Sequence, residues 1–194
     1  MPRATVLRAS TYRRMPWKNG GGETVEIAIS PEGAALSEFD WRISMATVAT
    51  DGPFSIFPGI DRTLSIIKGD GMSLAIAGRP PVLLTQENHP LAFPADVAVS
   101  ATLASGPITD LNVMTRRAGL RHDVERAEVN DRFKAGIGTL IWLVLCHRGS
   151  VSVEWQQESE FLNSGDTLLV EGAVGSDVTL SGKALCYLIS IGPA

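Results

Sequence analysis

Short apolar or alternating runs, each ended by a turn sequence, are the feature that most restricts how this chain of 194 residues can fold. Runs such as TVEIAIS, WRISMATVA and TLIWLVLC are separated by DGP, FPGID, KGDG, GRPP, NSGD and SGK. Such runs between Gly, Pro, Asn and Asp clusters are typical of strands joined by turns. Only RHDVERAEVNDRF, residues 121–133, could form a short helix. The pattern predicts an all-β sandwich or barrel.

The second half of the chain repeats the strand order of the first half. Residues 90–114 align without a gap on residues 166–190, which places a turn at Ser105–Gly106 and again at Ser181–Gly182. A similar match upstream places Gly69 over Gly149. Each copy has the strand order of a jelly-roll barrel, so we expect a bicupin, in which two double-stranded β-helix barrels pack together. The expected barrels are residues 1–118 and 119–194, strand exchange between them is left open, and a single irregular sandwich is the alternative.

Charge and hydropathy exclude several classes of protein. The net charge is −4 and the basic residues are scattered, whereas binding to a phosphate backbone favours a basic stripe. The chain contains no run of about eighteen apolar residues and no apolar stretch typical of a signal peptide. Cys146 and Cys186 lie in apolar runs, where buried free thiols are common. We therefore expect a cytoplasmic protein without a direct nucleic-acid or membrane partner.

The histidines do not have the spacing of a metal centre. His89, His122 and His147 are far apart in the sequence, and none has a carboxylate at the offset that a cupin metal site would need. The chain also lacks G-x-S-x-G, H-E-x-x-H and the P-loop lysine. The sequence therefore predicts no metal, no cofactor and no recognisable catalytic group.

Polar residues in DLNVM indicate a pocket inside the first barrel. Strand alternation puts Asp110, Asn112 and Met114 on one face and Leu111 with Val113 on the other. If the apolar pair packs outward, the acid and the amide point into the lumen, where they need partners. In the second copy, the positions of Asp110 and Asn112 are occupied by Cys186 and Leu188, so we expect the second barrel to be filled by apolar side chains.

The run WKNGGG, residues 17–22, has two interpretations. Three glycines allow close approach of a strand or a ligand, and their amides could form a concavity for an anion. Alternatively, Trp17 fills the end of the barrel and the glycines only permit a bulge. Together with other polar positions, the run gives this predicted set of ligand-binding residues: Lys18, Asn19, Thr24, Glu26, Arg62, Asp110 and Asn112.

Two members of this set have alternatives that the sequence leaves open. Glu26 shares a strand face with Thr24 and forms either part of the pocket wall or an exposed edge. Arg62 follows Asp61 after a Pro-Gly turn, so it either binds a carboxylate in bidentate fashion or forms a surface pair with its neighbour.

Three ordered blocks carry a resemblance to a known family. MPWKNGGGETVEI, WRISMATVATDGPFSIFPGIDRTLSIIKGDG and GPITDLNVMTRR resemble the HutD/Ves family of cupin-like proteins, over the first two thirds of the chain, through Arg117. The resemblance implies a two-barrel cupin fold. In one branch it implies a role in histidine utilisation as a sensor of a pathway intermediate, and in the other an association with environmental stress.

These observations favour a metal-independent protein that binds a small acidic metabolite. The resemblance makes urocanate and N-formylglutamate the first ligands to consider. A metal-independent cupin enzyme, a lyase, isomerase or hydrolase with Glu26 or Asp110 as general base, is one alternative. A stress-associated protein that binds a partner is another. A homodimer is left open, because cupins often pair through sheet faces.

Overall fold

The protein consists of β-strands throughout its length. A computed structural model describes residues 2–194, and 64% of the chain is strand. The described residues contain no α-helix and a single 3-10 turn, η1 (Ala9–Thr11). Contacts divide the chain into two compact units, Arg13–Arg121 and His122–Pro193, the second of which includes the residues up to Tyr12. This all-β architecture is the class that the turn-punctuated sequence predicts.

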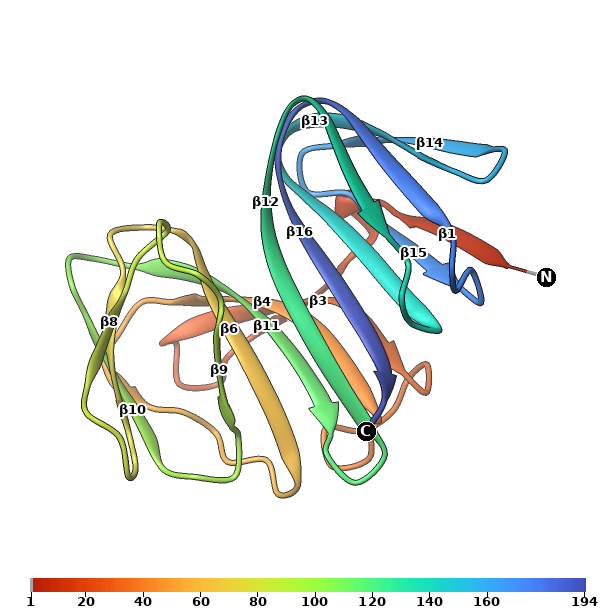
Figure 1. Ribbon diagram of the computed structural model, residues 1–194. Helices are drawn as coiled ribbons and strands as arrows, with labels where there is room; N and C mark the ends of the chain where they lie inside the picture. Colours follow the sequence, from red (N-terminus) through yellow and green to blue (C-terminus); the bar gives the residue numbers. More distant parts are fainter. Residues whose placement is uncertain (1) are drawn as a thin grey trace. The chain divides into compact units, whose positions relative to one another are not determined.

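The unit Arg13–Arg121 contains two antiparallel sheets. The first has six strands, in the order β2 (Arg13–Pro16), β3 (Gly22–Ser30), β4 (Trp41–Val48), β11 (Ile108–Arg116), β6 (Ile60–Lys68) and β9 (Leu91–Pro94). The second has four strands, in the order β5 (Gly52–Pro53), β10 (Val99–Leu103), β7 (Met72–Ile76) and β8 (Val82–Leu84). Figure 1 shows β8 and β10 in one layer and β6 and β11 in the other.

The core of this unit lies between its two sheets. Period-two alternation sends one face of each strand inward, so β4, β6 and β11 meet β7 and β10 across an apolar layer. Leu64, Met72 and Leu74 are completely buried there. Burying a side chain of this size stabilises the fold by about 1.5–3 kcal/mol. The cavity of the candidate functional site therefore lies in a unit with a well-packed apolar core.

The other unit is built on one six-stranded sheet. Its path is β1 (Arg3–Leu7), β15 (Thr167–Glu171), β13 (Ile141–Trp155), β16 (Asp177–Pro193) and β12 (Leu120–Gly136), while β14 (Glu158–Asn163) also pairs with β13. The first strand of the chain thus belongs to a sheet formed by the last third, because Arg3–Leu7 pairs with Thr167–Glu171. Cys186 and Leu188 are part of the apolar core here, as their side chains predicted.

The helix considered for residues 121–133 is wrong, because this segment lies within β12. Its exposed positions alternate with partly buried ones from Leu120 to Arg126, and Ala127 and Val129 are buried. Both stretches have the period of two that is typical of a strand, and the covered face changes between Arg126 and Ala127. A charged sequence of this kind gains little as an isolated helix, whereas β16 offers it backbone hydrogen-bond partners.

The expected turn at Ser181–Gly182 is also wrong. β16 runs through these residues, and β13 runs through Gly149, whereas Gly69 and Ser105–Gly106 do separate strands in the first half. Gly149 and Gly182 both have positive φ, and a Cβ on either would collide with the backbone of the opposite strand. The glycines therefore allow two long strands to bend together, with one register shift between Cys146 and Arg148, and both strands curve in Figure 1.

No helix within residues 2–194 has the length and apolar character needed to cross a membrane.

Candidate functional site

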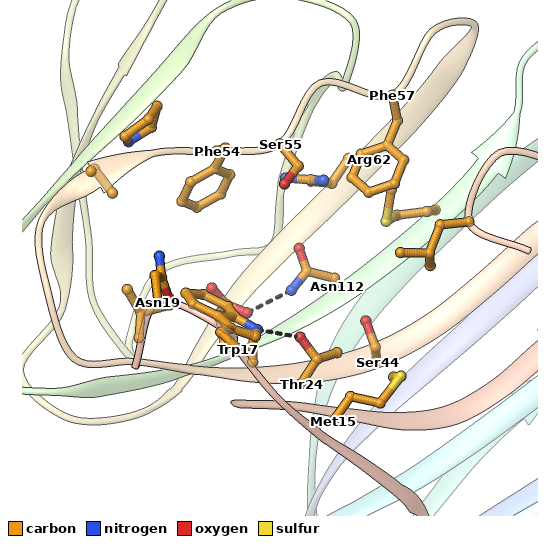
Figure 2. Close-up of a pocket in the computed structure, with 18 of the residues that line it drawn as sticks. Met15, Trp17, Asn19, Thr24, Ser44, Phe54, Ser55, Phe57, Arg62 and Asn112 are labelled. Carbon is orange, nitrogen blue, oxygen red and sulfur yellow. Dashed lines mark hydrogen bonds between the residues drawn. The ribbon is translucent and has the colours of Figure 1, made fainter. Parts of the chain in front are cut away.

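A large cavity opens in the unit Arg13–Arg121. Its volume is about 810 Å³, and its walls come from the β2–β3 connection, from β4, β6, β10 and β11, and from the loop that follows β5. Most of the ligand-binding residues predicted from the sequence line it: Lys18, Asn19, Thr24, Arg62, Asp110 and Asn112. Figure 2 shows Arg62, Phe54 and Phe57 on one side, with Trp17, Thr24 and Asn112 on the other. Strands distant in sequence thus bring these side chains together.

Asp110 and Asn112 point into the cavity from β11. They are spaced two residues apart on one face, and Asn112 donates a side-chain hydrogen bond to Asp110. The opposite face carries Leu111 and Val113, which are buried. Asp110 is only 1% exposed, and this burial raises the pKa of its carboxyl to about 7, although Arg62, Asn112 and the Ala46 backbone act in the opposite direction. The side of β11 predicted to face the lumen does so.

Arg62 is a buried cation that forms no salt bridge with any carboxylate in the described part of the chain. The residue is 6% exposed, and its Nε atom has no hydrogen-bond partner among the described residues. Aromatic rings surround it instead, because its guanidinium carbon lies 5.3 Å from the ring centres of Phe54 and Phe57 and 5.9 Å from that of Phe93. Burial lowers the pKa of Arg62 to about 10, although the charge of Asp110 opposes this shift.

The neighbouring acid at position 61 does not neutralise Arg62. Asp61 pairs with Arg117 at 2.8 Å, and Arg117 also binds Asp96 at 3.0 Å. Successive residues of β6 point to opposite faces, so Asp61 and Arg62 cannot share one partner. The alternative of an Asp61–Arg62 surface pair is therefore wrong, and Arg62 faces the cavity.

Glu26 occupies neither of the two positions considered for it. Its side chain is 10% exposed and binds Arg42 Nε at 2.7 Å, so it is no exposed edge residue. Among the described residues, the cavity is lined by Arg42 and not by Glu26. Arg42 is a cavity residue that the sequence interpretation missed. The alternation of WRISMATV, which puts Arg42 and Ser44 on one face, could have indicated it.

The WKNGGG run shapes the rim of the cavity. A Cβ on Gly22 would collide with the Thr47 carbonyl and lie 3.0 Å from the Trp17 ring, so glycine permits this close approach. The indole of Trp17 donates a 2.8 Å hydrogen bond to the Thr24 hydroxyl, drawn in Figure 2. Trp17 therefore lines the cavity and does not fill it.

The glycine amides do not form the concavity for an anion that the sequence suggested. The Gly20 N–H donates to the Trp17 carbonyl at 3.1 Å, and the Gly21 N–H donates to the Asn19 side chain at 3.0 Å. Both donors are thus used inside the turn. Lys18 and Asn19 are exposed at this rim, where they remain open to solvent.

The sequence interpretation also missed an aromatic wall. Phe54, Ser55 and Phe57 line the cavity from the loop between β5 and β6, in a segment that the sequence analysis treated only as turn punctuation. Two phenylalanines in a short loop only weakly indicate a cavity wall, because the direction of their side chains depends on contacts with Arg62 on β6.

No metal-binding cluster is formed by the part of the chain that the structure describes: residues 2–194 contain no group of three or more His, Cys, Asp or Glu side chains suited to an ion. The cavity presents a cation, an acid, an amide and aromatic rings. These groups suit a small organic anion with a flat apolar part, which an arginine and aromatic faces can bind together.

The sheets and the cavity define a protein of cupin-like fold, whose unit Arg13–Arg121 contains a large cavity lined by apolar, aromatic and charged side chains. Solved structures of low identity support the fold: a cupin 2 conserved barrel protein from Leptotrichia buccalis has a TM-score of 0.55 at 10% identity, covering 88% of both chains. The chain belongs to the HutD family, whose model matches residues 9–188.

Relatives cover most of the chain. A Pseudomonas putida protein described as an uncharacterized 21.2 kDa protein in the hutC 3′ region is 34% identical over 89% of both chains. Protein Ves of Citrobacter koseri is 40% identical over 60% of this chain and 61% of its own. The structure of HutD from Pseudomonas fluorescens SBW25 has a TM-score of 0.82 at 34% identity, covering 99% of this chain and 100% of that one.

Proposed function

We propose that this protein is a metal-independent bicupin that binds a small acidic metabolite in the cavity of the unit Arg13–Arg121, and that occupancy of the cavity acts as a signal in histidine degradation. The observation that carries the proposal is the buried guanidinium of Arg62, which forms no salt bridge within residues 2–194 and whose Nε atom has no hydrogen-bond partner there. A buried charge without a counter-ion destabilises a fold, so its retention in a cavity wall is explained if a ligand supplies the counter-ion.

The surroundings of Arg62 favour a carboxylate with a flat or apolar body. A planar guanidinium can bind a carboxylate through two parallel hydrogen bonds. Phe54, Phe57 and Trp17 provide apolar surface for the rest of the molecule, while Asn112 and Asp110 provide hydrogen-bonding groups in the same cavity. A lipid tail would leave these polar groups unpaired, which makes it a poor ligand.

The family narrows the choice of ligand. One relative is named for its position in the hutC 3′ region and another is named HutD, which supports a link to histidine utilisation. Urocanate and N-formylglutamate are the first candidates, since both are small carboxylates of that pathway. We further propose a cytoplasmic location, where these metabolites would be present.

Calorimetry and thermal unfolding with each metabolite test this function. A ligand that binds only the folded state should raise the melting temperature progressively as its concentration increases. The variant Arg62→Lys keeps the charge but loses the planar fork, so we expect a weaker complex. If neither metabolite changes the melting temperature or produces a binding heat, the proposed function is wrong.

Asp110 gives specific support to an enzymatic alternative. Its raised pKa of about 7 is suitable for a general base, and it lies in the cavity that would hold a substrate. Glu26 is a poorer candidate because Arg42 engages its carboxylate. NMR of each metabolite after prolonged incubation with the protein distinguishes the two functions. An unchanged spectrum supports a binding protein, whereas conversion that is lost in Asp110→Asn supports a lyase, isomerase or hydrolase.

A partner-binding role, associated with stress through the Ves branch, would not require the cavity to be occupied. It predicts that Arg62→Lys leaves the biological response unchanged. Sedimentation analysis with and without ligand would show at the same time whether the protein forms a homodimer and whether occupancy alters it.

A further inference from the structure

Arg62 and Asp110 are a cation and an acid that share one cavity without forming an ion pair. Both are buried and both line the cavity, from the adjacent strands β6 and β11. Within residues 2–194 no hydrogen bond or salt bridge joins them, since Asp110 accepts a hydrogen bond from Asn112 and the Arg62 Nε atom has no hydrogen-bond partner. Each nevertheless affects the titration of the other through space.

Other charges around Asp110 are compensated or lie at the rim. Arg42 of β4, which also faces the cavity, is held by Glu26 of β3. At the rim, Lys18 and Asp51 are exposed, so solvent screens their effect. The charged groups that face Asp110 from the surrounding elements are therefore Arg62, the Arg42–Glu26 pair, Lys18 and Asp51. Among them, Arg62 is the buried cation whose charge a ligand can cancel.

We infer that binding of an organic anion at Arg62 is coupled to the uptake of one proton at Asp110. This inference rests on the proposed function. An anion at Arg62 cancels the positive charge that favours ionised Asp110, and it adds a negative charge to the same cavity. The proton neutralises Asp110, which can then donate a hydrogen bond to the ligand. The cavity thus accepts an anion without keeping two negative charges together.

The pKa of Asp110 in the unliganded protein determines the pH range in which proton uptake can be measured. Burial raises the pKa of Asp110 to about 7, so Asp110 is mostly ionised at about pH 8 and mostly protonated at about pH 5.5. Binding raises this pKa further. Proton uptake should therefore be largest above neutrality and disappear in acid, and above neutrality the affinity should fall by up to about tenfold per pH unit.

Calorimetry in pairs of buffers with different ionisation enthalpies measures this uptake, with HEPES and Tris at about pH 8 and MES and piperazine at about pH 5.5. N-formylglutamate is the probe because its carboxylates stay ionised throughout this range. We expect close to one proton per site at about pH 8 and close to none at about pH 5.5, with Asp110→Asn showing none at either pH. Wild-type binding at about pH 8 with the same heat in both buffers would overturn the coupling and leave the proposed function intact.

A second measurement needs no ligand. The carboxyl carbon of Asp110 can be titrated by ¹³C NMR in wild type and in Arg62→Gln, where the charge is removed as an anion would cancel it. The Asp110 pKa should rise by about one unit or more, whereas the exposed substitution Arg79→Gln should leave it unchanged. An unchanged Asp110 pKa in Arg62→Gln would overturn the coupling, whether or not either metabolite binds. A failure of both metabolites to bind would overturn the proposed function instead.

Discussion

The guanidinium carbon of Arg62 lies 5.3 Å from the centre of the Phe57 ring, and this aromatic contact takes the place of an ion pair. A ring face attracts a cation but supplies no hydrogen-bond acceptor for the guanidinium. Arg62 is therefore held in position while its Nε donor has no partner among residues 2–194. Arg42, equally buried on β4 at the other side of β11, is instead bound by Glu26. The two arginines form a natural pair for comparison.

Replacing Arg62 with methionine should not destabilise the unliganded protein. The substitution removes an unpaired buried charge and keeps a flexible apolar side chain, so we expect unfolding free energy to stay equal or to rise by about 1–4 kcal/mol. Anion binding should be lost. Urea unfolding and calorimetry measure the two effects, and a clear loss of stability would show that Arg62 has a structural role.

Arg42→Met is the matched control for this substitution. It leaves Glu26 without its partner at a position that is 10% exposed, so it should lower the unfolding free energy by about 3–5 kcal/mol. Equal effects of the Arg42 and Arg62 substitutions would contradict the distinction between a paired and an unpaired arginine.

Asp110 should make the stability of the unliganded protein depend on pH. Its folded pKa of about 7 is higher than the unfolded value of 3.8, so the folded state binds more protons between these values. Stability should thus be greatest in acid and should fall as pH rises from about 4 to about 7, by an amount on the order of 4 kcal/mol. Urea unfolding across this range should show the slope in wild type and a flatter profile in Asp110→Asn. Equal slopes would show that another group is responsible.

Gly22 should tolerate no larger residue. Alanine there would drive a Cβ into the Thr47 carbonyl and against Trp17, so Gly22→Ala should cost about 3 kcal/mol. Gly119→Ala, where the added Cβ meets nothing within 4 Å, should change stability by less than about 0.5 kcal/mol. Thermal unfolding compares the two variants. Similar melting temperatures would mean that the close approach at Gly22 can relax.

Trp17 should report on occupancy of the cavity. Its indole lines the cavity and is tied to Thr24, so a bound metabolite should alter its fluorescence. Trp17→Phe should abolish that response and weaken binding by about fivefold to tenfold, because the smaller ring offers the ligand less apolar contact surface, a loss of about 1 kcal/mol. Trp155→Phe, in the core of the other unit, should keep the response. A response that survives in Trp17→Phe would place the ligand elsewhere.

Local patterns in the sequence determined much of this protein. The turn-punctuated runs determined the all-β class, and alternation in DLNVM placed Asp110 and Asn112 on one face of β11 with Leu111 and Val113 on the other. Such patterns are readable because the side-chain period of a strand is two, whatever its partner. The strand at the charged segment 121–133 could not be predicted from local pattern, because this segment pairs with β16, which lies far along the chain.

Only the tertiary structure decided which charges meet. Glu26 is paired because β3 and β4 align it near Arg42, whereas Arg62 stays unpaired because Asp61 faces away toward Arg117 and three aromatic rings fill the space around it. The sequence by itself determined the strands, their faces and the polar residues of one wall. Register and sheet packing bring together residues that are distant in the chain, and a pattern with a period of two holds no information about those partners.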